Sequence, residues 1–568
     1  MSDFARIPVY QLELDTPWCA NTYGVAPCTA AGTTKCYQTY GTCQDKTNYS
    51  KTIKTLSFCS TGAPIPAGRN VRPYIKKGGA DLPATEIDPR AGLAPRASCT
   101  FTLVDEPCPD TELDPYYSTR VTAATGTYWG RLLARHNSLS NVTARVKRAY
   151  FTNGWNDSEF ITEAYIVESI KGPDSQGEVR IVLKDPIKLA DRTKLPVPST
   201  GKLSVALSLS DLQVTLSSGD GSGYSSSGYI RIGDQIIRYT GKAGDVLSWP
   251  DGTYWGQFNT TAATASVGDV VQECLVYSNQ SFTDVVHDLL NRSGIADGNI
   301  DLTGIAAEDT QWLGADWRIT TCLHEPTSAS TYLQELAQQT GGVFWWDPVA
   351  AKVKYKFIGP QSPAALTSAT LTETSDIVLG SVDVQPLDDQ RMTRAFVGYN
   401  LTNATANVGE AKNYRAGRGY VDAGAESANE YGDVRSDVMY SRWLTTASDR
   451  AISAFVKRRV GQYRDVPRAI TVKVDAKDAD IEVGDLYDVT TSRIVDSTGA
   501  TRTVRCLVVK RKDNGRGLDL TLRTTNFSRR YGFIAPNGTS NYPNNGGYAC
   551  ACLNTGLFSD GSSGYLII

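Results

Sequence analysis

Four cysteines lie within 25 residues near the start of the chain, and their type and spacing suit metal chemistry. Eight, seven and six residues separate them in turn: Cys19, Cys28, Cys36 and Cys43. Clustered thiolates bind iron–sulfur clusters or structural zinc. Zinc sites usually place cysteines only about two to four residues apart. That spacing is absent here, so zinc is the weaker interpretation.

The residues between these cysteines suit a loop that wraps around a metal group. Glycine and proline allow sharp turns, and three tyrosines could keep water away from a cluster: Tyr23, Tyr37 and Tyr40. Four ordinary thiols that happen to lie close together are the alternative. Cys59 is a reserve ligand, but its setting in Leu-Ser-Phe-Cys favours a small buried thiol.

Length and composition describe a multidomain globular protein. The chain has 568 residues, of which 41% are hydrophobic and 21% charged, and its net charge is −3. This length predicts roughly three to five domains, and the charge draws the protein to neither nucleic acid nor an anionic membrane. With no leader-like start and no run of roughly 20 apolar residues, we expect synthesis in a cytoplasm. Clustered thiols there favour metal ligands over disulfides.

Periodicity predicts mostly β structure in the first two hundred residues. Residues 98–105 and 176–184 alternate like strands with one buried face, and 228–240 read as a β-hairpin across a Gly-Asp turn. A capped helix is then expected over 281–293, with its apolar stripe ending at Gly294.

The second half of the chain alternates helix and strand. A helix over 330–341 precedes a hairpin of 342–347 and 352–357, and a further helix is expected over 449–463. Strands return at 469–474, 504–510 and 518–522. The turn-rich end of the chain, with Cys550 and Cys552, reads as a contact arm.

No catalytic residues are predicted. The three histidines, His136, His287 and His324, fall in different segments, without a nucleophile motif or metal spacing beside them. The basic stretches 145–151 and 457–459 sit in amphipathic patterns and read as solvated faces rather than a nucleic-acid site.

The cysteine pattern and its Asn-Thr-Tyr and Thr-Cys-Gln-Asp surroundings resemble the cysteine-rich end of the tail tip protein L of phage lambda and similar siphophage proteins. That family carries a [4Fe-4S] cluster, so the resemblance gives the ligand role to Cys19, Cys28, Cys36 and Cys43. Here the cluster segment lies at the amino end, and its middle gap is shorter.

The order of elements is similar to tail and baseplate hub proteins of long-tailed phages and gene transfer agents. The implied fold is mainly β with α+β parts: two tail-tube-like β-barrel domains plus smaller β and α+β domains. The implied boundaries are 1–60 (iron–sulfur segment), 61–200 (first barrel), 201–280 (small β), 281–380 (α+β), 381–530 (second barrel) and 531–568 (carboxy-terminal arm).

The resemblance implies a non-enzymatic structural hub at the distal tail tip of a virion. It would form a homotrimer around the channel that DNA crosses without sequence recognition. Its partners would be the distal tail protein, the tape measure protein and tip or fibre proteins, with no small-molecule substrate. The alternatives are an iron–sulfur redox protein and a tail-associated cell-wall hydrolase.

Overall fold

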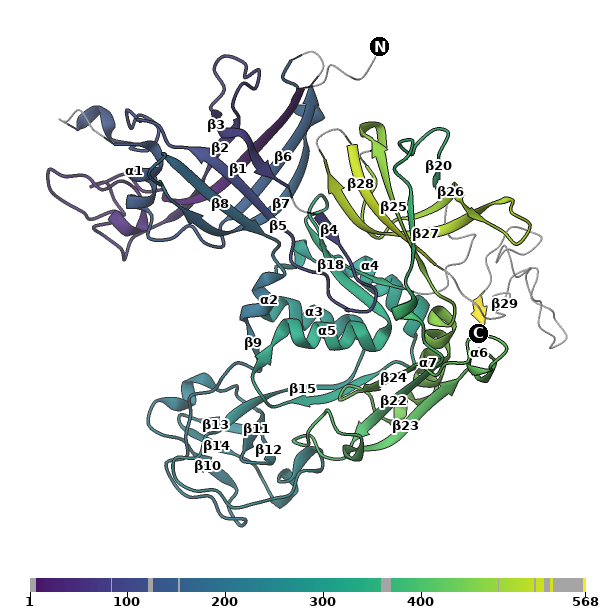
Figure 1. The fold of residues 1–568 in the computed structure, drawn as a ribbon. Coiled ribbons are helices and arrows are strands. Elements are labelled where there is room, and N and C mark those ends of the chain that lie inside the picture. The colour runs from purple at the N-terminus through teal and green to yellow at the C-terminus, as the bar shows by residue number, and fades with distance from the viewer. Residues whose placement is uncertain are drawn as a thin grey trace, which may run out of the picture.

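A computed structural model describes residues 7–82, 84–120, 126–151, 154–358, 369–478, 480–514, 517–525, 532–534 and 565–567. The fold is mainly β with α+β parts, which confirms the predicted class. Two large β regions lie side by side above a helical middle layer, and a small β domain hangs below it (Figure 1).

The amino-terminal region is a closed barrel in the strand order β1-β2-β3-β5-β8-β7-β6. Successive side chains of a strand point to opposite faces, so every second residue of each strand lies inside the barrel. In β5, for example, Cys99, Phe101 and Leu103 are buried and their neighbours are not. The strands are β1 (Ile7–Cys19), β2 (Lys51–Ser60), β3 (Arg72–Asp81), β5 (Ser98–Val104), β6 (Thr143–Phe151), β7 (Ile161–Lys171) and β8 (Glu178–Lys184).

One helix, α1 (Tyr128–Arg135), packs on this barrel core. The ring of Trp129 is fully buried and stacks 5.0 Å from that of Phe58 in β2. The barrel is followed by α2 (Lys188–Arg192) and by β9 (Lys194–Leu195), which leads toward the small β domain. The barrel strands and α1 thus share one buried hydrophobic core.

The small β domain has its own core around Ile230, Tyr239 and Trp249. The predicted hairpin of 228–240 is confirmed by β11 (Gly228–Ile232) and β12 (Gln235–Tyr239). The sheet continues through β15 (Gln272–Gln280) to β16 (Ile319–Leu323), which joins the domain to the middle layer. A second sheet contains β10 (Gln213–Thr215), β14 (Val246–Ser248) and β13 (Gly241–Ala243).

Helices dominate the middle layer. The predicted helices are confirmed as α3 (Phe282–Arg292), α5 (Ala329–Thr340) and α7 (Asp449–Tyr463). Ser281 caps α3 by accepting the Asp284 amide at 3.1 Å, and Gly341 ends α5 at φ +80°, a left-handed conformation that favours glycine. Shorter elements are α4 (Leu302–Glu308), β17 (Thr327–Ser328) and α6 (Ala423–Glu426).

Two smaller sheets pack against these helices. The predicted hairpin after α5 is β18 (Gly342–Asp347) with β19 (Lys352–Phe357), and its two faces enter different cores. Phe344 and Trp346 face the helices, whereas Val343 and Trp345 face the second β region. The other sheet has the order β23-β22-β24, from β22 (Arg394–Leu401), β23 (Tyr414–Val421) and β24 (Ser436–Tyr440).

The second large β region is a seven-stranded sheet whose path runs β20-β26-β27-β28-β25-β21. Its remaining strand, β4 (Ala84–Glu86), comes from the linker after β3 and pairs with β27. The amino-terminal part of the chain thus completes this sheet. The other strands are β20 (Ala369–Thr372), β21 (Asp383–Pro386), β25 (Arg468–Asp475), β26 (Leu486–Val495), β27 (Thr501–Asp513) and β28 (Gly517–Thr524).

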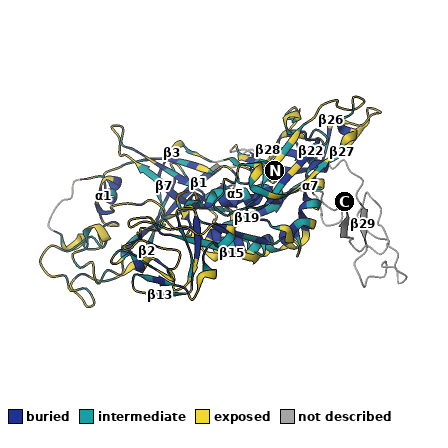
Figure 2. Ribbon diagram, turned by 90° about the horizontal axis from the view of Figure 1, so that it is seen from below, coloured by how far each residue is buried: buried dark blue, intermediate teal, exposed yellow. Residues whose placement is uncertain are grey.

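Burial follows the strands and helices, and exposed residues gather in the connecting loops (Figure 2). Within the described residues, no helix has the length and apolar character to cross a membrane. Most of the predicted carboxy-terminal arm, including Cys550 and Cys552, lies outside the described residues; β29 (Gly532–Ile534) and β30 (Tyr565–Ile567) pair with each other.

Candidate metal centre

The four clustered cysteines lie at one end of the β1–β2 hairpin. The last residue pair of that hairpin is Cys19 with Lys51, so residues 20–50 form one long excursion from the barrel, here called the cysteine loop. Cys19 ends β1, and Cys28, Cys36 and Cys43 follow along the loop. The barrel therefore supplies a fixed base at which the loop begins and ends.

Hydrogen bonds tie the cysteine loop to the barrel at several points. The Cys19 amide donates to the Gln38 carbonyl at 2.7 Å, which returns the middle of the loop to its start. The buried Thr39 hydroxyl donates to the Arg135 carbonyl at the end of α1 at 2.6 Å. The Tyr23 amide donates to the Tyr116 hydroxyl at 2.7 Å. The first bond folds the loop back on itself, and the other two attach it to residues outside the loop.

All four thiols lie close enough to influence one another electrostatically. Burial raises the pKa of the Cys36 thiol, and negative charge on Cys43, Cys19 and Cys28 raises it further, against a hydrogen bond from the Gln38 amide. All four residues are half-buried. The fold thus brings together the residues that the sequence places at intervals of six to eight.

The thiols are not arranged around a single ion. In the described part of the chain, no group of three or more His, Cys, Asp or Glu side chains could hold one metal ion as placed. A zinc ion draws its thiolates to about 2.3 Å from one centre. The four irons of a cubane cluster spread their thiolates over a wider volume than one ion does.

Tyr49 is a member of this site that sequence reasoning missed. Its hydroxyl is buried and has no hydrogen-bond partner among the described residues. Burial raises the Tyr49 pKa, and the nearby Cys19 and Cys43 raise it further. A buried donor without an acceptor costs about 1–3 kcal/mol. A cluster sulfur or thiolate would give this hydroxyl its acceptor, and the only sequence signal was an aromatic residue close behind the last cysteine.

Two arginines pack against Tyr37 of the cysteine loop. The guanidinium groups of Arg120 and Arg135 lie 4.0 Å and 4.1 Å from the centre of the Tyr37 ring. Arg120 also donates to the Cys36 carbonyl at 2.8 Å. Both guanidinium groups pair with carboxylates, Arg120 with Asp114 and Arg135 with Asp110, so they support the loop. The donor set and the orphaned hydroxyl fit an iron–sulfur cluster.

The turn after Thr29 stabilises the outer part of the cysteine loop. The Asp45 carboxylate accepts the Thr29 amide at 2.7 Å and also binds Asn48. The backbone hydrogen bond from Thr29, followed by the side chain of Asn48, lowers the Asp45 pKa to about 2. This carboxylate links Thr29 to Asn48 and so stabilises the conformation of the loop.

The remaining cysteines of the barrel lie apart from this arrangement. Cys59, the reserve ligand, is fully buried in β2, where it pairs with Gln11 at the opposite end of the strand from the loop. Burial raises its pKa to about 11. Cys99 is buried in β5, and Cys108 is buried in the following loop, where its sulfur accepts the Asp110 amide at 3.4 Å.

The three histidines occupy structural positions in different parts of the fold. His136 is buried against Trp18, and burial followed by the charge of Arg135 lowers its pKa to about 4. His287 lies 2.7 Å from Asp297 at the surface of α3. Burial, then the charge of Arg231, lowers the pKa of His324. In the described part of the chain, none of these three imidazoles belongs to a group of side chains that could hold a metal ion.

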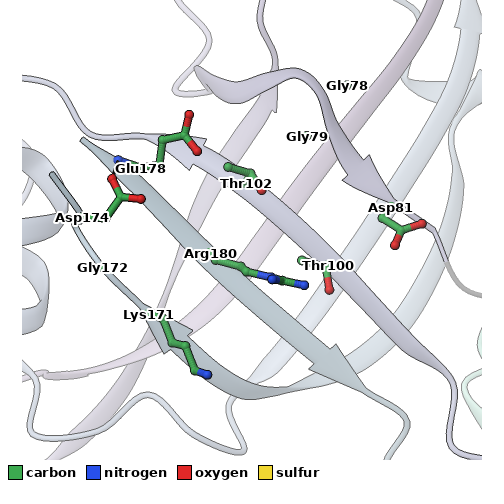
Figure 3. Close-up of a pocket in the computed structure, with 10 residues that line it drawn as sticks. All are labelled: Gly78, Gly79, Asp81, Thr100, Thr102, Lys171, Gly172, Asp174, Glu178 and Arg180. Atoms are coloured by element: carbon green, nitrogen blue, oxygen red, sulfur yellow. Dashed lines mark hydrogen bonds between the residues drawn. The ribbon is translucent and has the colours of Figure 1, made fainter. Parts of the chain in front are cut away.

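A polar hollow of about 490 Å³ lies on the outer wall of the barrel (Figure 3). Asp174 and Glu178 lie at one end, Asp81 at the other, and Arg180 between them. Asp174 accepts the amides of Gln176 and Glu178 at 2.9 Å, and these bonds, Glu178 first, lower its pKa. A general acid needs the opposite shift, so Asp174 suits turn formation and not acid catalysis.

No family model matches the sequence, and no curated protein matches it. Solved structures that resemble the fold include a tail protein from Neisseria meningitidis MC58, at 11% identity over 78% of this chain and 91% of that one, TM-score 0.37. A 43 kDa tail protein of prophage MuSo2 from Shewanella oneidensis has 10% identity over 80% and 96%, TM-score 0.35. A chain of a gene transfer agent virion has 11% identity over 66% and 80%, TM-score 0.29.

Proposed function

We propose that this chain is a structural hub protein at the distal end of a long, non-contractile phage-type tail, and that its cysteine loop holds a [4Fe-4S] cluster. The observation that carries the proposal is the gathering of Cys19, Cys28, Cys36 and Cys43 at one end of a closed barrel. The electrostatic effect of the other three cysteines on Cys36 supports a shared role for the motif on which the resemblance to tail tip proteins was based.

In this proposal the four thiolates hold the cluster, which supplies a rigid cross-link between distant points of the loop. Such a link stabilises a loop that has little apolar surface to bury, because metal binding and local folding are coupled. Arg120 fixes the loop at Cys36 by donating to its carbonyl, and the Tyr49 hydroxyl, which lies near Cys19 and Cys43, would donate to the cluster. The role is that of a folding staple.

The cluster is tested by an absorption spectrum with iron and acid-labile sulfide assays on protein purified without oxygen. We expect visible absorbance from the wild type and its loss in a Cys28→Ser/Cys43→Ser double variant. Cys506→Ser, which removes a buried thiol of β27, is the matched control and should keep the absorbance. A colourless wild type that binds zinc, or no metal, would refute the cluster.

The hub role predicts a homotrimer around a channel that DNA crosses without sequence recognition. Expected partners are the distal tail protein, the tape measure protein and the tip or fibre proteins, and the expected location is the virion. Light scattering on the purified chain, alone and with the adjoining tail protein, tests this assembly. A monomer under both conditions would contradict the trimeric hub while leaving the cluster assays unaffected.

The two alternative functions make different predictions for the same protein. An iron–sulfur redox protein would pass electrons to an added acceptor at a rate that depends on the cluster. A cell-wall hydrolase would clear peptidoglycan in a zymogram. We expect neither activity, because the proposed role of this chain is structural.

A further inference from the structure

A second pair of neighbouring thiols lies far from the cysteine loop in the sequence. Cys274 is in β15 and Cys322 is in β16, and these strands run antiparallel beside each other. Val276 is the direct partner of Cys322, so Cys274 is its diagonal neighbour on the same face of the sheet. Cys322 is 6% exposed, and Cys274 is half-buried and open to small molecules.

The two thiols interact in this reduced form. The hydrogen bond with Cys274 and then burial raise the pKa of Cys322 well above its usual range. The pairing of β15 with β16 begins at Leu275, opposite Leu323. Cys274 lies one residue before this first pair. Diagonal neighbours lie near the upper limit that a disulfide spans, so closing the bond must draw Cys274 and Cys322 together, and the β15–β16 pairing has not yet begun at Cys274 to oppose that shift.

This pair marks the point where the small β domain joins the rest of the molecule. β15 changes partner there: Tyr229 of β11 pairs with Cys274, and β16 takes over from Leu275 onward. The domain is otherwise linked across this junction by polar bonds between surface segments. These are Arg231 with His324 at 3.0 Å, the Thr405 hydroxyl with the Asp234 carbonyl at 3.1 Å, and the Ala404 amide with the Phe258 carbonyl at 3.2 Å.

We propose that Cys274 and Cys322 are a redox-active dithiol that closes to a disulfide and fastens the small β domain to the middle layer. The oxidant is a small-molecule disulfide. The Cys274 thiolate attacks one of its sulfurs, forms a mixed disulfide and releases one thiol. The Cys322 sulfur, after losing its proton to solvent, attacks Sγ of Cys274 and releases the second thiol. Two protein thiols are oxidised, and one small disulfide is reduced to two thiols.

The closed form would restrict motion at the junction. The disulfide would join two strands through a loop of the intervening chain, residues 275–321, and such a link limits the unfolded and partly opened states. The reduced form leaves the small β domain held by strand pairing, by side-chain packing along β15 and by polar bonds such as the three above. This inference goes beyond the hub role and the cluster and depends on neither.

Peptide mapping of the full-length protein tests the proposal. The reduced protein is treated with oxidised glutathione at neutral pH and then unfolded in denaturant, so that N-ethylmaleimide blocks every remaining thiol, and its peptides are analysed by mass spectrometry. In the wild type we expect a peptide pair linked through Cys274 and Cys322, with loss of the maleimide label at both residues. The Cys322→Ser variant should instead retain glutathione on Cys274.

Two comparisons keep the result decisive. Cys506 is a buried strand cysteine without a neighbouring thiol on its cross-strand partners Tyr487 and Thr524, and it should keep its maleimide label throughout. The loop cysteines give separate peptides and do not affect the reading. The proposal is overturned if the wild type retains glutathione on Cys274 as Cys322→Ser does, or if Cys274 and Cys322 both keep the maleimide label.

Discussion

Two polar regions of the molecule are stabilised in different ways: the cysteine loop, and a charged junction between the barrel and the second sheet. The junction centres on Arg148 of β6, whose guanidinium donates to Glu163 at 3.1 Å and pairs with Asp513 of β27. All three side chains are at least nine-tenths buried. Tyr150 and Tyr165 donate to the same two carboxylates at 3.1 Å and 3.0 Å.

The cysteine loop lacks this internal balance. Its thiols are half-buried, ionisation of the other three would raise the pKa of Cys36, and the buried Tyr49 hydroxyl has no acceptor among the described residues. The junction satisfies its carboxylates with groups of the chain itself, although Nη2 of Arg148 is buried without a hydrogen-bond partner among the described residues, whereas the loop gathers four thiols. The difference teaches that opposite charges let the chain satisfy a buried site largely by itself, and that gathered thiols leave a role for the proposed ligand.

The largest effect is expected from removing the central cation of the junction. Arg148→Met leaves Glu163 and Asp513 buried without their partner, which should lower the free energy of unfolding by about 3–5 kcal/mol. Urea unfolding followed by tryptophan fluorescence measures it. Because Asp513→Asn removes one of the stranded charges, the double variant should lose less. A loss under about 1 kcal/mol in Arg148→Met would mean that the junction does not depend on this pairing.

The sequence predicted local elements well and this junction not at all. The α3 cap at Ser281 and the 228–240 hairpin depend on residues close together in the sequence. Periodicity and turn chemistry are therefore enough to predict them. Arg148, by contrast, lies in a stretch that the sequence suggested was a solvated face, and the structure corrects this, because the residue is 2% exposed. Its partner Asp513 is 365 positions away, and no local pattern encodes such a contact.

The cysteine loop lies between these two extremes. Spacing identified Cys19, Cys28, Cys36 and Cys43 as one group because thiols clustered within one loop suit a shared ligand. Their supports, by contrast, come from outside the loop: Arg120 follows β5, and Arg135 belongs to α1. These arginines reach the loop only through tertiary packing, and the sequence did not reveal their positions.

The next effect in size concerns Glu482, which lies beside the junction and 3.8 Å from Arg511. Burial raises its pKa to about 7, Arg511 opposes the shift, and Asp347 and Glu163 add to it. The folded state therefore binds the proton more tightly than the unfolded state. That stabilisation is fully present below about pH 4.5 and is lost as the pH rises through about 7.

Glu482→Gln should remove this pH dependence. We expect the variant to be about 1–3 kcal/mol more stable than the wild type at pH 8 and nearly equal to it at pH 5. Urea unfolding at the two pH values measures the difference, and Glu106→Gln, at an exposed residue, is the control. Equal effects of Glu482→Gln at both pH values would show that the carboxyl does not titrate in this range.

A smaller effect is expected at the base of the cysteine loop. Thr39→Val keeps the shape of a fully buried side chain but removes the hydroxyl that donates to the Arg135 carbonyl. We expect a loss of about 1–2 kcal/mol and faster protease cleavage within residues 20–50. Thr33→Val, at an exposed residue of the same loop, should change neither measurement noticeably. Equal cleavage of both variants would show that the hydrogen bond from Thr39 to α1 does not hold the loop in place.

The smallest effect is expected from an exposed ion pair on the same barrel. Arg69 pairs with Asp157, but their side chains are 41% and 60% exposed, so water and salt screen the attraction. Arg69→Ala should change the urea midpoint less than Thr39→Val does, and the change should shrink further in 1 M salt, where the Debye length is about 3 Å. A loss as large as that of Arg148→Met would break the comparison, because burial would then not be what makes the junction strong.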